Sequence, residues 1–258
     1  MAEKPATANA VIRILRLLLQ FAVDEGYISQ NPASKPRLIA VPPRQQIWTN
    51  DDLADFVASA ERAGRRSMAL AVLMGIHLGQ RQGDILRLDW SQYDGTVVTL
   101  RQSKTGALLK IPVVRELAAA LEATPRLSTT ILVAESTERP YRADHFHHEF
   151  RRIANDAGLA SLQFLDLRRS AVVRLAEAGC TTAEIAAITG HRLERTMQIL
   201  ETYLPRTLPM AEAAIRKLEL HIDRTELDKT QEQMLKSWTT ICKCLILVPK
   251  RGFEPRTY

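Results

Sequence analysis

The segment LQFLDLRRSAVVRLAEAGC, residues 162–180, carries a pair of arginines at the head of an otherwise apolar helix. The spacing of Leu, Val and Ala predicts that one side of this helix is buried. A guanidinium presents a planar fork of permanently charged donors, which suits the non-bridging oxygens of a phosphate. The pair Arg168 and Arg169 is therefore suited to a phosphate. Leu165, just before the pair, can neither move a proton nor hydrogen-bond such a group.

The helices that must position these residues are predicted from apolar residues at helical spacing. Thr49 or Asn50 can cap the second helix, whose first turn contains acidic residues. The predicted helices are residues 8–25, 49–63, 67–78, 114–123, 142–157, 166–178, 182–189, 193–201 and 208–220.

The periodicity changes from helical to alternating after the third predicted helix. GTVVTLRQ and ALLKIPV flank SKTG, which predicts a β-hairpin with Gly106 in its turn. A short strand is predicted at TTILVA. The expected fold is therefore mainly α with a small antiparallel β-sheet.

The order of these features resembles the catalytic domain of the tyrosine recombinases, the phage integrase family. A helix, an arginine turn, a hairpin with a lysine at its tip, an arginine helix, TGH and a tyrosine follow one another. The likeness runs from about residue 10 to 220. It implies the tyrosine-recombinase (DNA breaking-rejoining) catalytic fold, preceded by a partial helical core-binding domain.

The same resemblance divides the chain into four parts. Residues 1–34 are expected to be the remnant of a helical core-binding (SAM-like) domain, since LLLQFAVDEGYISQNPA resembles its last helix. Residues 35–47, rich in proline, are expected to form a linker, and residues 48–220 the catalytic domain. Residues 221–258 are expected to be a poorly ordered tail.

The candidate catalytic residues are carried over motif by motif from the family. The motifs are LGQRQGDILRLDW, SKTG, LDLRR, ITGHR and ILETYLPRT. They supply Arg81, Lys104, Arg168, His191 and Tyr203, with Asp84 as support for the first arginine. The family usually has histidine where this chain has Leu165, which marks a departed catalytic position.

These residue types suit cleavage of a DNA phosphodiester without a metal or other cofactor. A tyrosine hydroxyl can attack phosphorus and store the bond energy in a covalent ester. Two arginines stabilise the charge on the phosphate, a lysine can protonate the departing 5′ oxygen, and a histidine can assist. The loss of one such group at Leu165 is expected to slow the reaction about 10²–10³-fold without abolishing it.

The resemblance implies a site-specific recombinase for integration or excision of a mobile element. The implied partners are double-stranded DNA at attachment sites, a homotetramer on that DNA and accessory DNA-bending proteins. Lys plus Arg outnumber Asp plus Glu by 35 to 29, which also favours a polyanion. Three cysteines without a zinc framework indicate the cytoplasm. The apolar stretch 67–79 is too short to cross a bilayer, so no membrane partner is expected.

Several alternatives remain open. Arg81 and Arg168 could be surface charges paired with Asp84 and Asp166, and Tyr203 a half-buried aromatic residue. The whole chain could be a degenerate integrase remnant that binds DNA without catalysis, or, less in keeping with its length, a topoisomerase-like relaxase. The segment DHFHHEF, 144–150, has too few additional ligands to favour a metal site.

Overall fold

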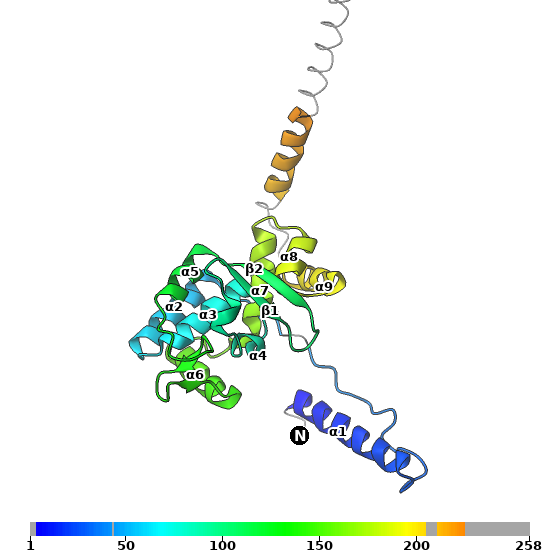
Figure 1. Ribbon diagram of the computed structural model, residues 1–258. Coiled ribbons are helices and arrows are strands. Elements are labelled where there is room, and N and C mark those ends of the chain that lie inside the picture. The colour runs from blue at the N-terminus through cyan, green and yellow to red at the C-terminus, as the bar shows by residue number, and fades with distance from the viewer. Residues whose placement is uncertain (1–3, 43, 205–210, 225–258) are drawn as a thin grey trace, which may run out of the picture.

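The apolar helix α3, Arg66–Leu78, is the element around which the others pack. The computed structural model describes residues 4–42, 44–204 and 211–224. Figure 1 shows α3 in the middle of the body, with α2 (Asn50–Arg62), α5 (Arg115–Glu122) and α6 (Ala143–Asp156) around it. On its other side lies α7, Phe164–Glu177. A side chain at Gly75 would press on Leu167, so this glycine lets α3 and α7 approach closely.

The remaining elements surround the α7 side of the body. They are α4 (Gln82–Ile85), η1 (Trp90–Gln92), β1 (Val97–Arg101), β2 (Leu108–Pro112), β3 (Val133–Ala134), β4 (Arg139–Pro140), α8 (Thr182–Thr189) and α9 (Leu193–Tyr203). β1 and β2 pair antiparallel from Val97↔Pro112 to Arg101↔Leu108, and β2 contacts α8. β3 and β4 form a second small antiparallel pair. The expected fold class, mainly helical with little antiparallel sheet, is confirmed.

The predicted helices are all present, with ends shifted by a few residues. Thr49 caps α2 through a reciprocal capping box with Asp52, as the first-turn acidic residues indicated. Only Val133 and Ala134 of the predicted strand at 129–134 pair as a strand. The residues before them instead follow the 88–90 segment, where the Ile131 amide donates to the Leu88 carbonyl. The last predicted helix is observed at 211–224. The predicted tail from 225 onward lies outside the described residues.

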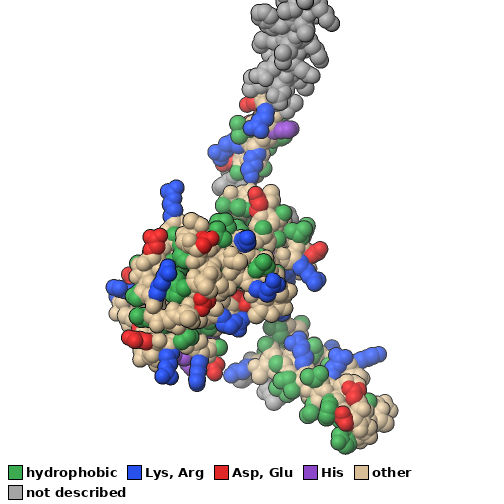
Figure 2. Space-filling model, viewed as in Figure 1, with side chains coloured by type: hydrophobic (Ala, Val, Ile, Leu, Met, Phe, Trp, Pro, Cys, Tyr) green, Lys and Arg blue, Asp and Glu red, His purple; other side chains and the backbone are tan. Residues whose placement is uncertain are grey.

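The first helix, α1 (Pro5–Asp24), lies apart from the body in Figure 1 and is joined to it by the segment 25–49. Asn9 holds that segment, donating to the Ile39 carbonyl at 2.7 Å and accepting from its amide at 2.9 Å. Apolar side chains cover much of the face of α1 seen in Figure 2.

By length and composition, α1 is apolar enough to cross a membrane. The expectation drawn from 67–79 therefore does not hold for every described helix, because the 20 residues of α1 were not considered there. An exposed helix that packs on another protein can have the same length and composition, so this property alone assigns no membrane contact.

Candidate functional site

Arg168 lies on the first turns of α7 and is only 8% exposed. Its Nη1 donates to the Gly79 carbonyl at 2.8 Å, and its Nε donates to His191 Nε2 at 3.0 Å. Its Nη2 is buried without a hydrogen-bond partner among the described residues. The guanidinium is therefore held rigidly on two sides and keeps one unsatisfied donor, which an anionic oxygen would satisfy.

His191 follows α8, which Gly190 ends in the left-handed conformation with φ of 67°. Burial lowers the pKa of His191 to about 3, helped by the nearby charges of Arg168 and Arg81. The ring is therefore neutral at pH 7. Because its Nε2 accepts from Arg168, the proton lies on Nδ1, which is 3.0 Å from the hydroxyl of Thr189. In this arrangement His191 orients the arginine and has no proton to give at Nε2.

Two buried glutamines join the two arginine motifs. Arg168 Nη1 lies 3.4 Å from Gln80 Oε1, which accepts from Gln102 Nε2 at 2.6 Å. Gln102 Oε1 accepts from Arg81 Nη1 at 3.3 Å. Gln102 Nε2 also donates to the Thr189 carbonyl at 2.8 Å. We call these side chains, with His191, the polar network; it connects α7, the start of α4, the hairpin and the end of α8.

Asp84 connects the first arginine motif to the hairpin. Its Oδ1 accepts from the Ser103 amide at 3.0 Å and the Ser103 hydroxyl at 2.7 Å. Its Oδ2 lies 3.9 Å from Arg81 Nη1 and has no hydrogen bond with the described residues. Asp84 thus keeps the residue just before Lys104 next to Arg81, which agrees with the supporting role expected for it.

The net charge of the site is positive. Burial lowers the pKa of Arg168 to about 10, and the charge of Arg81 lowers it further against a smaller opposite effect of Asp84. Arg168 therefore stays protonated at pH 7. Two guanidiniums lie within electrostatic reach of each other, and Asp84 is the carboxylate that offsets them. This combination favours binding of an anion.

Two predicted residues lie at the surface near this network. Lys104 is exposed in the hairpin turn and forms no hydrogen bond or ion pair with the described residues. Leu165, on the first turn of α7, is 54% exposed beside a hollow of about 70 Å³ that Gln82 and His147 also line. The position where the family has histidine is therefore open, and no other described residue fills it.

Tyr203 is the predicted site residue that the structure does not bring to the network. Its hydroxyl donates to the backbone carbonyl of Arg44, and its ring lies 4.5 Å from the guanidinium carbon of Arg169. It packs against a small cluster that includes Val172 and Ile199. Among the described residues, no hydrogen bond joins Tyr203 to Arg81, Arg168 or His191.

The alternative pairing of Arg168 with Asp166 is wrong. Asp166 is fully buried and pairs with Arg44 at 2.8 Å and with Arg169 at 3.3 Å. It also accepts the Gln163 amide at the start of α7. Arg168 instead contacts Gly79 and His191, so the two arginines of the pair serve different places.

Gln80 and Gln102 were not predicted as site residues. Their only signal in the sequence is a polar side chain beside the first arginine motif and beside the lysine motif. Surface glutamines are common next to charged residues, and the burial that distinguishes these two is visible only in the fold.

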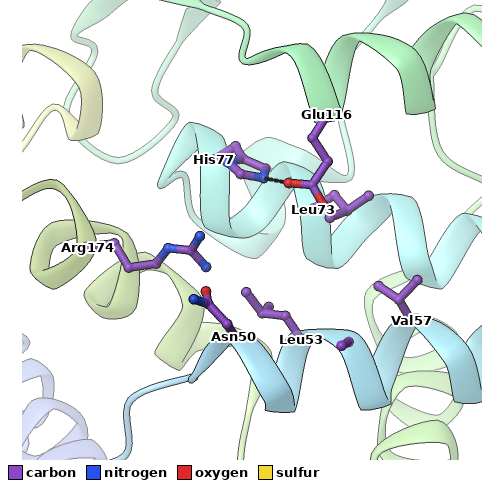
Figure 3. A pocket seen from close by; sticks show the side chains of 8 residues that line it. Asn50, Leu53, Val57, Leu73, His77, Glu116 and Arg174 are labelled. Carbon is purple, nitrogen blue, oxygen red and sulfur yellow. Dashed lines mark hydrogen bonds and ion pairs between the residues drawn. The ribbon is translucent and has the colours of Figure 1, made fainter. Parts of the chain in front are cut away.

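The described residues contain no group of histidine, cysteine and acidic side chains that could hold a metal ion. A hollow of about 310 Å³ lies away from the network, between α2, α3, α5 and α7. Figure 3 shows its polar side chains: His77 Nε2 contacts Glu116 at 3.0 Å, and Arg174 points toward Asn50. None of the predicted site residues lines it.

The comparisons with known proteins agree with this arrangement. A family model described as the phage integrase family matches residues 47–203. The integrase of Escherichia phage HK022 is 32% identical over 112 residues, which are 42% of this chain and 30% of that protein. The integrase of Escherichia phage lambda is 30% identical over a stretch of the same length and coverage. The matched stretch thus spans less than a third of these relatives.

Solved structures show the same fold. A lambda integrase dimer bound to a COC′ core site has a TM-score of 0.61 and 23% identity, covering 74% of each chain. A Tn1549 transposon integrase in complex with a circular intermediate DNA has a TM-score of 0.60 and 18% identity. That match covers 82% of this chain and 79% of the transposon integrase.

Proposed function

Because the chain belongs to the phage integrase family, we propose that it cleaves and rejoins double-stranded DNA through a 3′-phosphotyrosyl intermediate. The observation that supports this most is the buried guanidinium of Arg168, which retains one unpaired donor among the described residues beside a second cation, Arg81. A surface arginine needs no such support, whereas a group that must meet developing negative charge benefits from being held in advance.

The proposed step conserves the number of phosphoester bonds. The Tyr203 oxygen attacks phosphorus, the bond from phosphorus to the 5′ oxygen breaks, and Lys104 gives that oxygen a proton. The phenol proton passes to solvent, because Leu165 carries no base and His191 Nε2 is occupied by Arg168. Arg81 and Arg168 stabilise the phosphate charge throughout. Attack by the 5′ hydroxyl of another strand then reverses the step and releases Tyr203.

The substrate and assembly follow from the family as further proposals. We propose that the DNA is an attachment site of a mobile element and that the chain integrates or excises that element in the cytoplasm. Solved relatives include a lambda integrase tetramer bound to a Holliday junction. A homotetramer on paired sites, assisted by DNA-bending proteins, is accordingly the assembly we propose.

The test captures the covalent intermediate on DNA of any sequence. Purified protein is incubated with fragmented, randomly nicked genomic DNA of the source organism, denatured with SDS, and precipitated with potassium. DNA that stays attached is sequenced, and the modified peptide is identified by mass spectrometry. The wild type should yield adducts on Tyr203 at a common sequence, Tyr203→Phe none, and Arg168→Lys about 10²–10³-fold fewer.

The rival function, DNA binding without catalysis, is favoured by the leucine at 165 and by the hydrogen bond that holds Tyr203 outside the polar network. A gel shift on the same DNA separates the two. Binding with no adduct from the wild type would support the remnant, and an adduct at another tyrosine would exclude Tyr203 as the nucleophile.

A further inference from the structure

Arg169, the second arginine of the pair, has no part in the polar network. Its Nη1 donates to the Gln46 carbonyl at 3.1 Å and to Asp166 at 3.3 Å. The same guanidinium lies over the ring of Tyr203, where a cation is attracted by the aromatic face. One side chain thus contacts the segment before α2, the helix α7 and the proposed nucleophile at the end of α9.

The segment 44–48 is fixed to α7 by several bonds that span the chain. Arg44 Nη2 donates to Asp166 at 2.8 Å and to the Ser161 carbonyl at 2.8 Å. The Trp48 amide donates to the hydroxyl of Ser170 at 2.8 Å. These contacts bring the Arg44 carbonyl to the place where it accepts the Tyr203 hydroxyl.

The phenol oxygen must be free for attack on phosphorus. In this structure its proton is donated to a backbone carbonyl, and its ring is covered by a guanidinium. That carbonyl belongs to the segment that joins α1 to the body, so a movement of this segment would remove the acceptor. The side chains that fix this arrangement are those of Arg44 and Arg169, and neither forms a hydrogen bond with a member of the polar network.

We propose that Arg44 and Arg169 are positioning residues that hold Tyr203 on the segment 44–48 and away from the polar network until that segment is displaced. The proposal rests on the proposed function, since it takes Tyr203 as the nucleophile. Displacement of the segment breaks the hydrogen bond of the phenol and exposes its ring. Cleavage is then limited by this release, and weakening either arginine contact accelerates it.

The first experiment measures the accessibility of the phenol without DNA. The full chain is treated with N-acetylimidazole, and acetylation of each tyrosine is followed by mass spectrometry. Tyr27, 77% exposed, and the buried Tyr141 are internal references. In the wild type Tyr203 should react several-fold more slowly than Tyr27, and in Arg44→Ala or Arg169→Ala its rate should rise toward that of Tyr27. Equal rates for Tyr203 and Tyr27 in the wild type would overturn the proposal.

Arg151→Ala is the matched control. Arg151 also donates to backbone carbonyls before α7, those of Ala160 and Leu162, but it has no hydrogen bond to Tyr203 or the segment 44–48. Its loss should leave the Tyr203 rate unchanged, with melting temperatures reporting any general loosening. An equal rise in Arg151→Ala, or no rise in either of the other variants, would overturn the proposal.

The second experiment measures single-turnover cleavage at saturating protein on the nicked site found by adduct capture. Arg44→Ala and Arg169→Ala should form adduct several-fold faster than the wild type; an unchanged or slower rate would overturn the proposal. The acetylation experiment needs no activity. A wild type that forms no adduct would therefore contradict the proposed function, while the holding of Tyr203 would still be decided by its accessibility.

Discussion

Leu165 stands three residues before Arg168, so both lie at the same end of α7 but face different surroundings. The arginine is buried and fixed, whereas the leucine is exposed beside a small hollow. An exposed leucine contributes little burial, so its replacement has little effect on folding. The position can therefore be tested for chemistry without disturbing the core.

We expect Leu165→His to increase the single-turnover cleavage rate by about 10²-fold, because it adds a group able to donate to the phosphate or accept the phenol proton. The free energy of unfolding should stay within about 0.5 kcal/mol of the wild type. The rate is measured on the nicked attachment site. Leu165→Ala is the control for a change in size alone; if it accelerates cleavage as much, the imidazole is not the cause.

At the scale of elements, the turn from α8 into α9 and the base of the β1–β2 hairpin fit together at one glycine. Gly190 has φ of 67°, and a side chain there would lie 2.6 Å from the amide nitrogen of Gln102 and 2.9 Å from Leu109. Gln102 cannot easily move away, because its amide nitrogen already donates to Gln80 and to Thr189. The glycine thus lets the polar network form.

Gly190→Ala should therefore cost more than its backbone conformation alone requires. Gly158 is a matched control, since its φ is 75° and no atom lies within 4 Å of where its side chain would be. Gly158→Ala should lower the free energy of unfolding by about 1–2 kcal/mol. Gly190→Ala should lower it by roughly 1–3 kcal/mol more. Urea denaturation measures both; equal losses would show that Gln102 yields freely.

The helices were predictable because each buries an apolar stripe, and that pattern is local in the sequence. Arg81 and Arg168 were found because their motifs are also local. The role of Gln102 was not, because its partner Thr189 is 87 residues away. The resting contact of Tyr203 joins residues 159 apart, and it involves a backbone carbonyl that leaves no mark in the sequence.

For the whole molecule, the segment 44–48 links three parts that the sequence places far apart. It connects toward α1 on one side, is fixed to α7 through Asp166, and accepts the phenol at the end of α9. The state of the nucleophile is thereby coupled to the position of the N-terminal segment. Basic side chains on the face shown in Figure 2 add a salt-dependent attraction to DNA, since they release its counterions.

The folding stability of the whole chain should depend on the proton at His191. Its pKa is about 3 when folded and 6.5 at its ordinary value, so between these values the unfolded chain binds a proton that the folded chain does not. The free energy of unfolding therefore rises with pH from about 3 to 6.5 and loses this dependence above 6.5. Arg168, with a pKa of about 10, is protonated in both states here and adds no slope. We expect His191→Gln to flatten the rise measured by urea denaturation between pH 4 and 7, leaving the slope above pH 7 unchanged. Parallel curves for the two proteins across the acid range would show that the folded imidazole takes up its proton freely.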